Sequence, residues 1–188
     1  LGFAKKIIYR NNAKLNDDIY VTGNLGDSFV GLQILKKRFK VQKKIKNYFV
    51  QKYFLPDIQL KIIKKLLCFA NTSIDISDGI IEDLEKMINK QNLSYTLNLN
   101  DIPISKHLIK LIKKEKLKKF NMISNGDDYQ VLFTANPSKN RIILNSSKNL
   151  GIKITRIGKI NSGNRKSTIF GQKGKQIVIK NQGYVHQF

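Results

Sequence analysis

The segment Ser73–Gly79 constrains the fold most, because the period of the apolar residues changes there. A short apolar strand, with Ile74 and Ile76 alternating, ends in a turn that carries two acids and a hydroxyl. A helical pattern then begins, and its apolar residues are Ile80, Ile81, Leu84, Met87 and Ile88. A change from period 2 to period 3.6 predicts a strand followed directly by a helix.

The polar residues of this turn form a candidate cation and phosphate site. Alternate strand side chains share a face, so Asp75 and Ser77 are expected to point the same way, with Asp78 at the turn. Gly79 allows an unusual backbone conformation or a close approach to a ligand. Hard cations such as Mg²⁺ prefer carboxylate oxygens and often keep substrate phosphates as further ligands. Ligands also bind beside strand ends in α/β proteins.

Strand-like and helix-like segments alternate along the chain with no long linker, repeat or low-complexity tract. This order predicts one α+β domain over residues 1–188, with a mixed β-sheet flanked by helices. We expect strands at 18–22, 73–76, 95–99, 128–134, 152–157, 168–170 and 176–179. We expect helices at 29–39, 45–54, 58–69, 80–90, 105–116 and 137–148. Asp27 or Ser28 would cap the first helix and Asp57 the third.

The formal net charge of +22 raises the hypothesis of a nucleic-acid partner. Arginine supplies only five of the 35 basic residues, although it is the residue best suited to bidentate phosphate and base contacts. The lysines are spread along predicted helices. We therefore favour solvated lysine faces over nucleic-acid binding.

The single cysteine excludes an intrachain disulfide and fits a reducing compartment. Cys68 lies in an apolar helical pattern, and we expect it to be a small core residue. No signal peptide is recognisable at the start, and no stretch reaches the roughly 18 apolar residues of a membrane span. These features predict a cytoplasmic protein without a membrane partner.

A second acidic turn, Ser124–Tyr129, carries Asp127 and Asp128 directly before an apolar strand. Asp and Gly are ordinary turn residues, so either acidic turn alone is a weak signal. Two of them beside predicted strands in a lysine-rich chain strengthen the case for a site. The loop Gly23–Ser28 could cradle a phosphate before a helix, but a plain connection is the simpler interpretation because no Walker A pattern follows.

The order of these motifs resembles the C-terminal half of bacterial thiamine-monophosphate kinase, a family within the aminoimidazole ribonucleotide synthetase superfamily. The resemblance covers essentially the whole chain. Its motifs are Asp18–Gly23 with Gly26–Ser28, Ile74–Gly79 with Asp83, Gly126–Tyr129, and Gly183-Tyr184 with His186 and Phe188. The resemblance implies a mixed sheet in three layers, as in the C-terminal domain of aminoimidazole ribonucleotide synthetase.

The resemblance also implies a reaction and a set of site residues. The family transfers the γ-phosphoryl group of ATP to thiamine monophosphate, with Mg²⁺ neutralising the charge. It would make Asp75 and Asp78 metal ligands and would place Ser77 on an ATP phosphate. Asp127 stands where the family usually has a glutamate that contacts thiamine monophosphate. Asn181 stands where an aromatic residue usually lies against the substrate ring.

Family members also carry an N-terminal domain, which dimerises and binds magnesium, and we expect that domain to be absent from residues 1–188. This polypeptide alone would then bind nucleotide weakly and be inactive. The N-terminal domain on a separate chain and a homodimer both remain open. Two alternative functions are another ATP-binding member of the superfamily and a non-catalytic basic module that binds nucleic acid.

Overall fold

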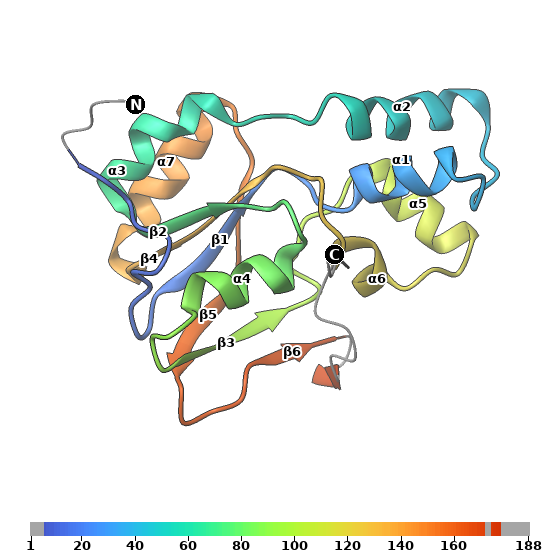
Figure 1. The fold of residues 1–188 in the computed structure, drawn as a ribbon. Coiled ribbons are helices and arrows are strands. Elements are labelled where there is room, and N and C mark those ends of the chain that lie inside the picture. The colour runs from blue at the N-terminus through green and yellow to red at the C-terminus, as the bar shows by residue number, and fades with distance from the viewer. Residues whose placement is uncertain (1–5, 172–173, 178–188) are drawn as a thin grey trace, which may run out of the picture.

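The structure is a computed structural model that describes residues 6–171 and 174–177. Within these residues, seven strands form one sheet in the order β2-β4-β1-β5-β3-β6-β7 (Figure 1). The strands are β1 Asp18–Thr22, β2 Ala70–Asp75, β3 Leu93–Asn98, β4 Val131–Ala135, β5 Ile154–Ser162, β6 Thr168–Phe170 and β7 Gln176–Ile177. The pairing of β3 with β6 is parallel and the other described pairings are antiparallel, so the sheet is mixed.

The two faces of the sheet are covered by different helices. On one face, α4 (Ile80–Ile88) packs on a core that includes Ile19 and Val21 of β1. On the other face, Tyr20 and Phe133 stack with ring centroids 5.3 Å apart, beneath α3 (Ile63–Phe69) and α7 (Asn140–Leu150). Because alternate residues of a strand point to opposite faces, β1 is buried along its whole length.

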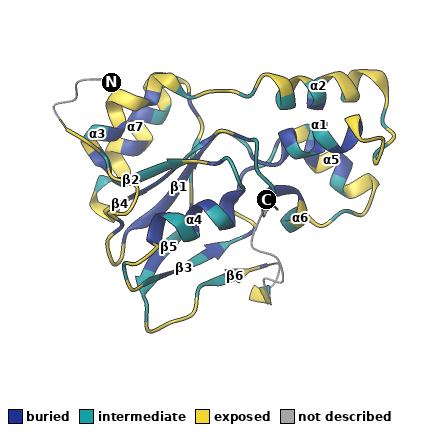
Figure 2. Ribbon diagram, viewed as in Figure 1, coloured by how far each residue is buried: buried dark blue, intermediate teal, exposed yellow. Residues whose placement is uncertain are grey.

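Two short 3₁₀ helices precede the helices of that second face. They are η1 (Leu60–Ile62) before α3 and η2 (Pro137–Lys139) before α7. Helices on both faces give the three layers that the sequence predicted, and the buried side of α4 is visible in dark blue (Figure 2).

Four further helices form a lobe beside the sheet (Figure 1). They are α1 (Asp27–Leu35), α2 (Lys43–Phe54), α5 (Lys106–Lys114) and α6 (Lys119–Ile123). Their shared core consists of Val30, Ile34, Phe49, Leu108, Leu111 and Met122. Gly31 allows α1 and α2 to approach closely, because a Cβ there would overlap the carbonyl oxygen of Phe49. No helix in the described part of the chain is both long and apolar enough to cross a membrane.

Several local expectations are wrong. Cys68 is exposed, because α3 is a single short helix whose buried residues are Leu66 and Phe69. In α1 the buried apolar residues are Val30 and Ile34, and Leu35 is exposed. The packing of α2 across Gly31 selects this other stripe.

The predicted caps also differ from the observed ones. Gly26 occupies the N-cap of α1 and no side chain caps that helix. Asp57 lies before η1 and forms an ion pair with Lys52 at 2.5 Å. Ser105 does cap α5, through its hydroxyl oxygen, which accepts a hydrogen bond from the Leu108 N–H.

Candidate functional site

The two acidic turns lie side by side at the ends of neighbouring strands. Strands β2 and β4 pair up to Asp75 and Val131, and backbone hydrogen bonds continue beyond that register. The Ile76 N–H donates to the Gln130 carbonyl at 2.8 Å, and the Asp127 N–H donates to the Ser77 carbonyl at 3.0 Å. The predicted turns around residues 77 and 127 therefore form one unit.

Two glycines make this close approach possible. A Cβ at Gly126 would overlap the carbonyl oxygen of Ser77, and a Cβ at Gly79 would overlap that of Ser124. Gly79 also has a φ of 115°, which side-chain-bearing residues rarely adopt. Each turn thus carries a glycine where the other turn passes against it.

A buried carboxylate holds the first turn in shape. Asp83 Oδ2 accepts hydrogen bonds from the backbone N–H groups of Ser77 (3.0 Å), Asp78 (3.0 Å) and Gly79 (3.2 Å). Its other oxygen accepts from Lys86 Nζ at 3.1 Å. Asp83 lies in the first turn of α4 and is fully buried, so it fixes the backbone that presents Asp75 and Asp78.

The three candidate carboxylates remain accessible. Asp75 is exposed and Asp78 and Asp127 are partly exposed. Burial, together with the negative charge of Asp78, raises the pKa of Asp127. Burial and the charges of Asp127, Asp75 and Asp78 raise the pKa of Tyr129. The structure therefore brings these acids around one phenol, as expected for a site that concentrates negative charge.

A third loop joins the two acidic turns. The Gly26 N–H donates to Asp128 Oδ2 at 2.8 Å, across 102 residues of sequence. Asp128 is buried, and burial raises its pKa to about 8. Its carboxyl group takes the Gly26 N–H at the start of α1, so the loop Gly23–Ser28 acts as a connection, as the simpler interpretation held.

Asp27 lies next to this loop and is also buried. Its carboxylate accepts hydrogen bonds from the hydroxyls of Tyr48 and Ser105, both at 2.7 Å. Burial raises the pKa of Asp27 in spite of these two donors. A small polar cavity of about 80 Å³ lies here, between Asp27, Asp128 and the segment that contains Asp57.

The oxygen-rich donor set suits a hard cation such as Mg²⁺ in its chemistry. Within residues 6–171 and 174–177, however, no three His, Cys, Asp or Glu side chains are grouped so that they could hold a metal ion. Lys86 forms an ion pair with Asp78 and so supplies a positive charge to this carboxylate. The described residues thus offer part of a magnesium site, with Asp75 and Asp78 as its predicted ligands.

Some functional residues were missed in the sequence. Asp83 is an acid four residues after Gly79, and that spacing could have indicated a carboxylate that caps the preceding turn. Asp128 looked equivalent to Asp127, and nothing local distinguished the buried acid from the accessible one. The predicted substrate residue Asn181 lies outside the described residues.

Comparisons with known proteins identify this fold and its relatives. A family model described as AIR synthase related protein, C-terminal domain, matches residues 15–171. A thiamine-monophosphate kinase of Buchnera aphidicola subsp. Schizaphis graminum is 37% identical over 183 residues, which cover 97% of this chain and 56% of that protein. The chain spans about half the length of the curated relatives it matches.

Two solved structures share the fold. The crystal structure of thiamine-monophosphate kinase from Stenotrophomonas maltophilia superimposes with a TM-score of 0.77 at 24% identity, covering 90% of this chain and 54% of that one. AaThiL complexed with AMPPCP and TMP gives a TM-score of 0.75 at 24% identity, covering 95% and 54%. Because the family model matches most of the chain and the sheet agrees with these neighbours, the chain belongs to the AIR synthase related protein family, through the C-terminal domain of that family.

Proposed function

We propose that this chain is the C-terminal domain of an ATP-dependent thiamine-monophosphate kinase. The observation that carries the proposal is the pair of interlocked acidic turns, which presents Asp75, Asp78 and Asp127 at one end of β2 and β4. The Buchnera relative is named for this activity, and a structural neighbour was solved with AMPPCP and TMP.

The reaction would move the γ-phosphoryl group of ATP onto a phosphate oxygen of thiamine monophosphate. The bond from the γ-phosphorus to the bridging oxygen of ADP breaks, and a new phosphorus–oxygen bond forms to give thiamine diphosphate. Both reactants are anions, so catalysis depends mainly on alignment and charge neutralisation. Bound Mg²⁺ would supply that neutralisation.

The residues of this chain would position the reactants. Asp75 and Asp78 would hold the cation, and Asp83 would keep their turn rigid. Ser77 would contact an ATP phosphate, and Asp127 would face thiamine monophosphate from the second turn. A φ of 67° at Asp127 suits aspartate better than glutamate, which is consistent with the shorter acid at this position. Asn181 remains a predicted substrate contact.

We further propose that residues 1–188, assayed alone, bind nucleotide weakly and do not turn over. The described residues offer an incomplete set of metal ligands, and phosphoryl transfer between two anions needs full charge compensation. Chromatographic detection of thiamine diphosphate after incubation with ATP, Mg²⁺ and thiamine monophosphate tests this. Magnesium-dependent product from the isolated chain would refute the inactivity proposal.

The same assay separates the proposal from its alternatives. A panel of other phosphorylated acceptors tests whether the chain belongs to another ATP-using branch of the superfamily. A basic nucleic-acid module would instead bind oligonucleotides with an affinity that falls steeply with salt and does not depend on Asp75 or Asp78. The cytoplasmic location stays a prediction.

A further inference from the structure

An exposed apolar segment links the helical lobe to the sheet. Five of its side chains are large, apolar and at least half exposed: Phe54 (64%), Leu55 (68%), Ile58 (66%), Leu60 (68%) and Ile63 (53%). We name these five residues the apolar strip. The strip runs from the end of α2 to the start of α3 along one edge of the molecule, where the ribbon is largely yellow (Figure 2).

The size of the strip marks it as an interaction surface. Five such side chains expose on the order of 500 Å², near the upper end of what a monomeric protein shows in one patch. A stable dimer buries roughly 800 Å² on each partner. The strip alone falls below that value, but it fits a contact between domains, which buries less and is more polar.

The backbone of the strip is fixed before any partner arrives. Gln130 Nε2 donates to the Asp57 carbonyl at 3.1 Å, and Gln59 Nε2 donates to Gln130 Oε1 at 3.2 Å. The Thr22 hydroxyl also donates to Gln130 Oε1, at 2.9 Å. Gln130 is buried and directly follows the acidic turn of Asp127 and Asp128. The strip is therefore anchored to the candidate site, which lowers the entropy cost of binding there.

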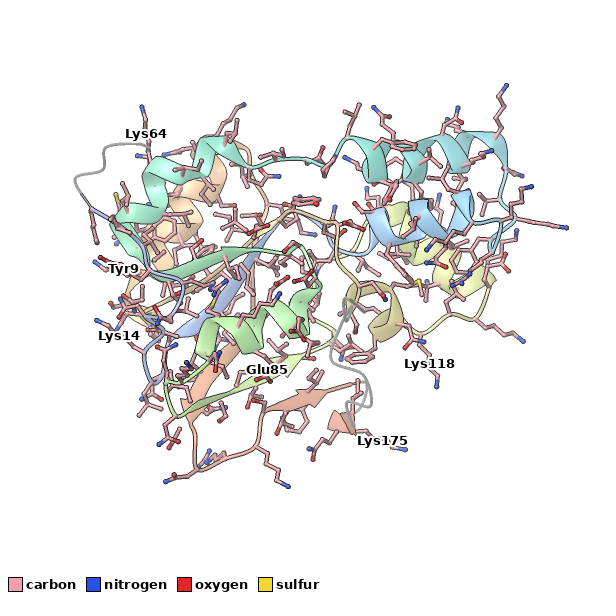
Figure 3. All side chains as sticks on the ribbon, viewed as in Figure 1. Tyr9, Lys14, Lys64, Glu85, Lys118 and Lys175 are labelled. Carbon is pink, nitrogen blue, oxygen red and sulfur yellow. The ribbon has the colours of Figure 1, made fainter. Side chains whose placement is uncertain are left out.

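Charge around the strip argues against a second copy as its occupant. Lys61, Lys64 and Lys65 are exposed on η1 and α3, and Lys64 points outward from α3 (Figure 3). Two copies joined through the strip would bring these lysines together, and like charges at an interface are unfavourable. An apolar partner face with an acidic rim would instead complement the strip.

We propose that the apolar strip is the docking surface for the part of the relatives' chain that lies outside the match to residues 1–188. The Buchnera relative is matched over 56% of its length, so the remainder is large enough to be a domain. Docked on the strip, this domain borders Asp57 and the cavity shared with Asp27 and Asp128. It would supply the ligands that the described carboxylates lack. The proposal rests on the family and not on the proposed reaction.

Hydroxyl-radical footprinting tests the docking without nucleotide or turnover. The unmatched part of the Buchnera relative is joined to residues 1–188, and the rate of side-chain modification is compared with that of residues 1–188 alone. We expect modification of Leu55, Ile58 and Leu60 to fall roughly five-fold or more, as for side chains that enter an interface core. Ile142 and Leu144, which are 43% and 49% exposed on α7, are the matched controls and should not change.

Equal modification of the strip in both molecules would overturn the proposal. If the joined chain does not fold, the full-length Buchnera relative is footprinted at the segment that aligns with residues 54–63, where the same protection is expected and its absence is again contrary. Sedimentation of residues 1–188 provides a separate check. A dimer that Leu55→Ser with Ile58→Ser dissociates would assign the strip to a second copy and overturn the proposal.

Discussion

Replacing Asp83 with alanine is expected to destabilise the chain strongly, although Asp83 is not itself a predicted ligand. The substitution removes the acceptor of three backbone N–H groups, at 3.0, 3.0 and 3.2 Å, and one partner of Lys86. Each hydrogen bond to a charged group contributes roughly 1.5–3 kcal/mol, and a buried donor left unpaired adds a desolvation cost.

The magnitude is smaller than the sum of these bonds. Ser77 and Asp78 are partly exposed, so water can reach their N–H groups in the variant, whereas Gly79 is buried. We therefore expect Asp83→Ala to lower the free energy of unfolding by about 3–5 kcal/mol, as for other buried ionic partners. That is a large fraction of the roughly 5–15 kcal/mol typical of a domain.

Urea unfolding followed by far-ultraviolet circular dichroism measures this effect. Glu82→Ala is the matched control, because Glu82 is an acid in the same first turn of α4. Loss of its interaction with the helix dipole should cost only about 0.3–1 kcal/mol. Asp83→Asn, which keeps an acceptor oxygen, should fall between the two. If Asp83→Ala and Glu82→Ala are equally stable, the role assigned to Asp83 is wrong.

Three further predictions concern other parts of the chain. Burial raises the pKa of Asp128 to about 8, so folding takes up a proton, and wild-type stability should fall by about 1.4 kcal/mol per pH unit between pH 5 and 7 relative to Asp128→Asn; urea unfolding curves of equal pH dependence would contradict this. Gly126→Ala should unfold at much lower temperature than Gly151→Ala in a thermal melt, because a Cβ meets backbone at the first position and open space at the second. Cys68 is exposed and should react with a thiol reagent as quickly in the native chain as in urea; slow native labelling would count against its placement.

Local patterns were sufficient to predict most of the sheet and both acidic turns. Alternation at Ile19 and Val21 predicted β1, and the switch in period after Gly79 predicted α4, because these signals depend on residues a few positions apart. Each strand is bounded by residues that favour turns. The three-layer arrangement followed from the alternation of strands and helices.

Long-range packing decided what the sequence left open. Asp127 and Asp128 are neighbours in sequence, but the N–H of Gly26, 102 residues away, holds only the second acid inside the protein. The buried stripe of α1 was wrong because Gly31 brings α2 against it. Cys68 was wrong because α3 has seven residues, too few turns for the apolar pattern to specify one buried face.

The most direct measurement is calorimetric titration of the chain with a non-hydrolysable ATP analogue, with and without Mg²⁺, at moderate salt. The predicted result is weak binding that requires Mg²⁺ and is lost in Asp78→Asn, with Asp101→Asn as an exposed control that binds like the wild type. Binding that is the same in Asp78→Asn and the wild type, or no magnesium-dependent binding at all, would contradict the proposed nucleotide site.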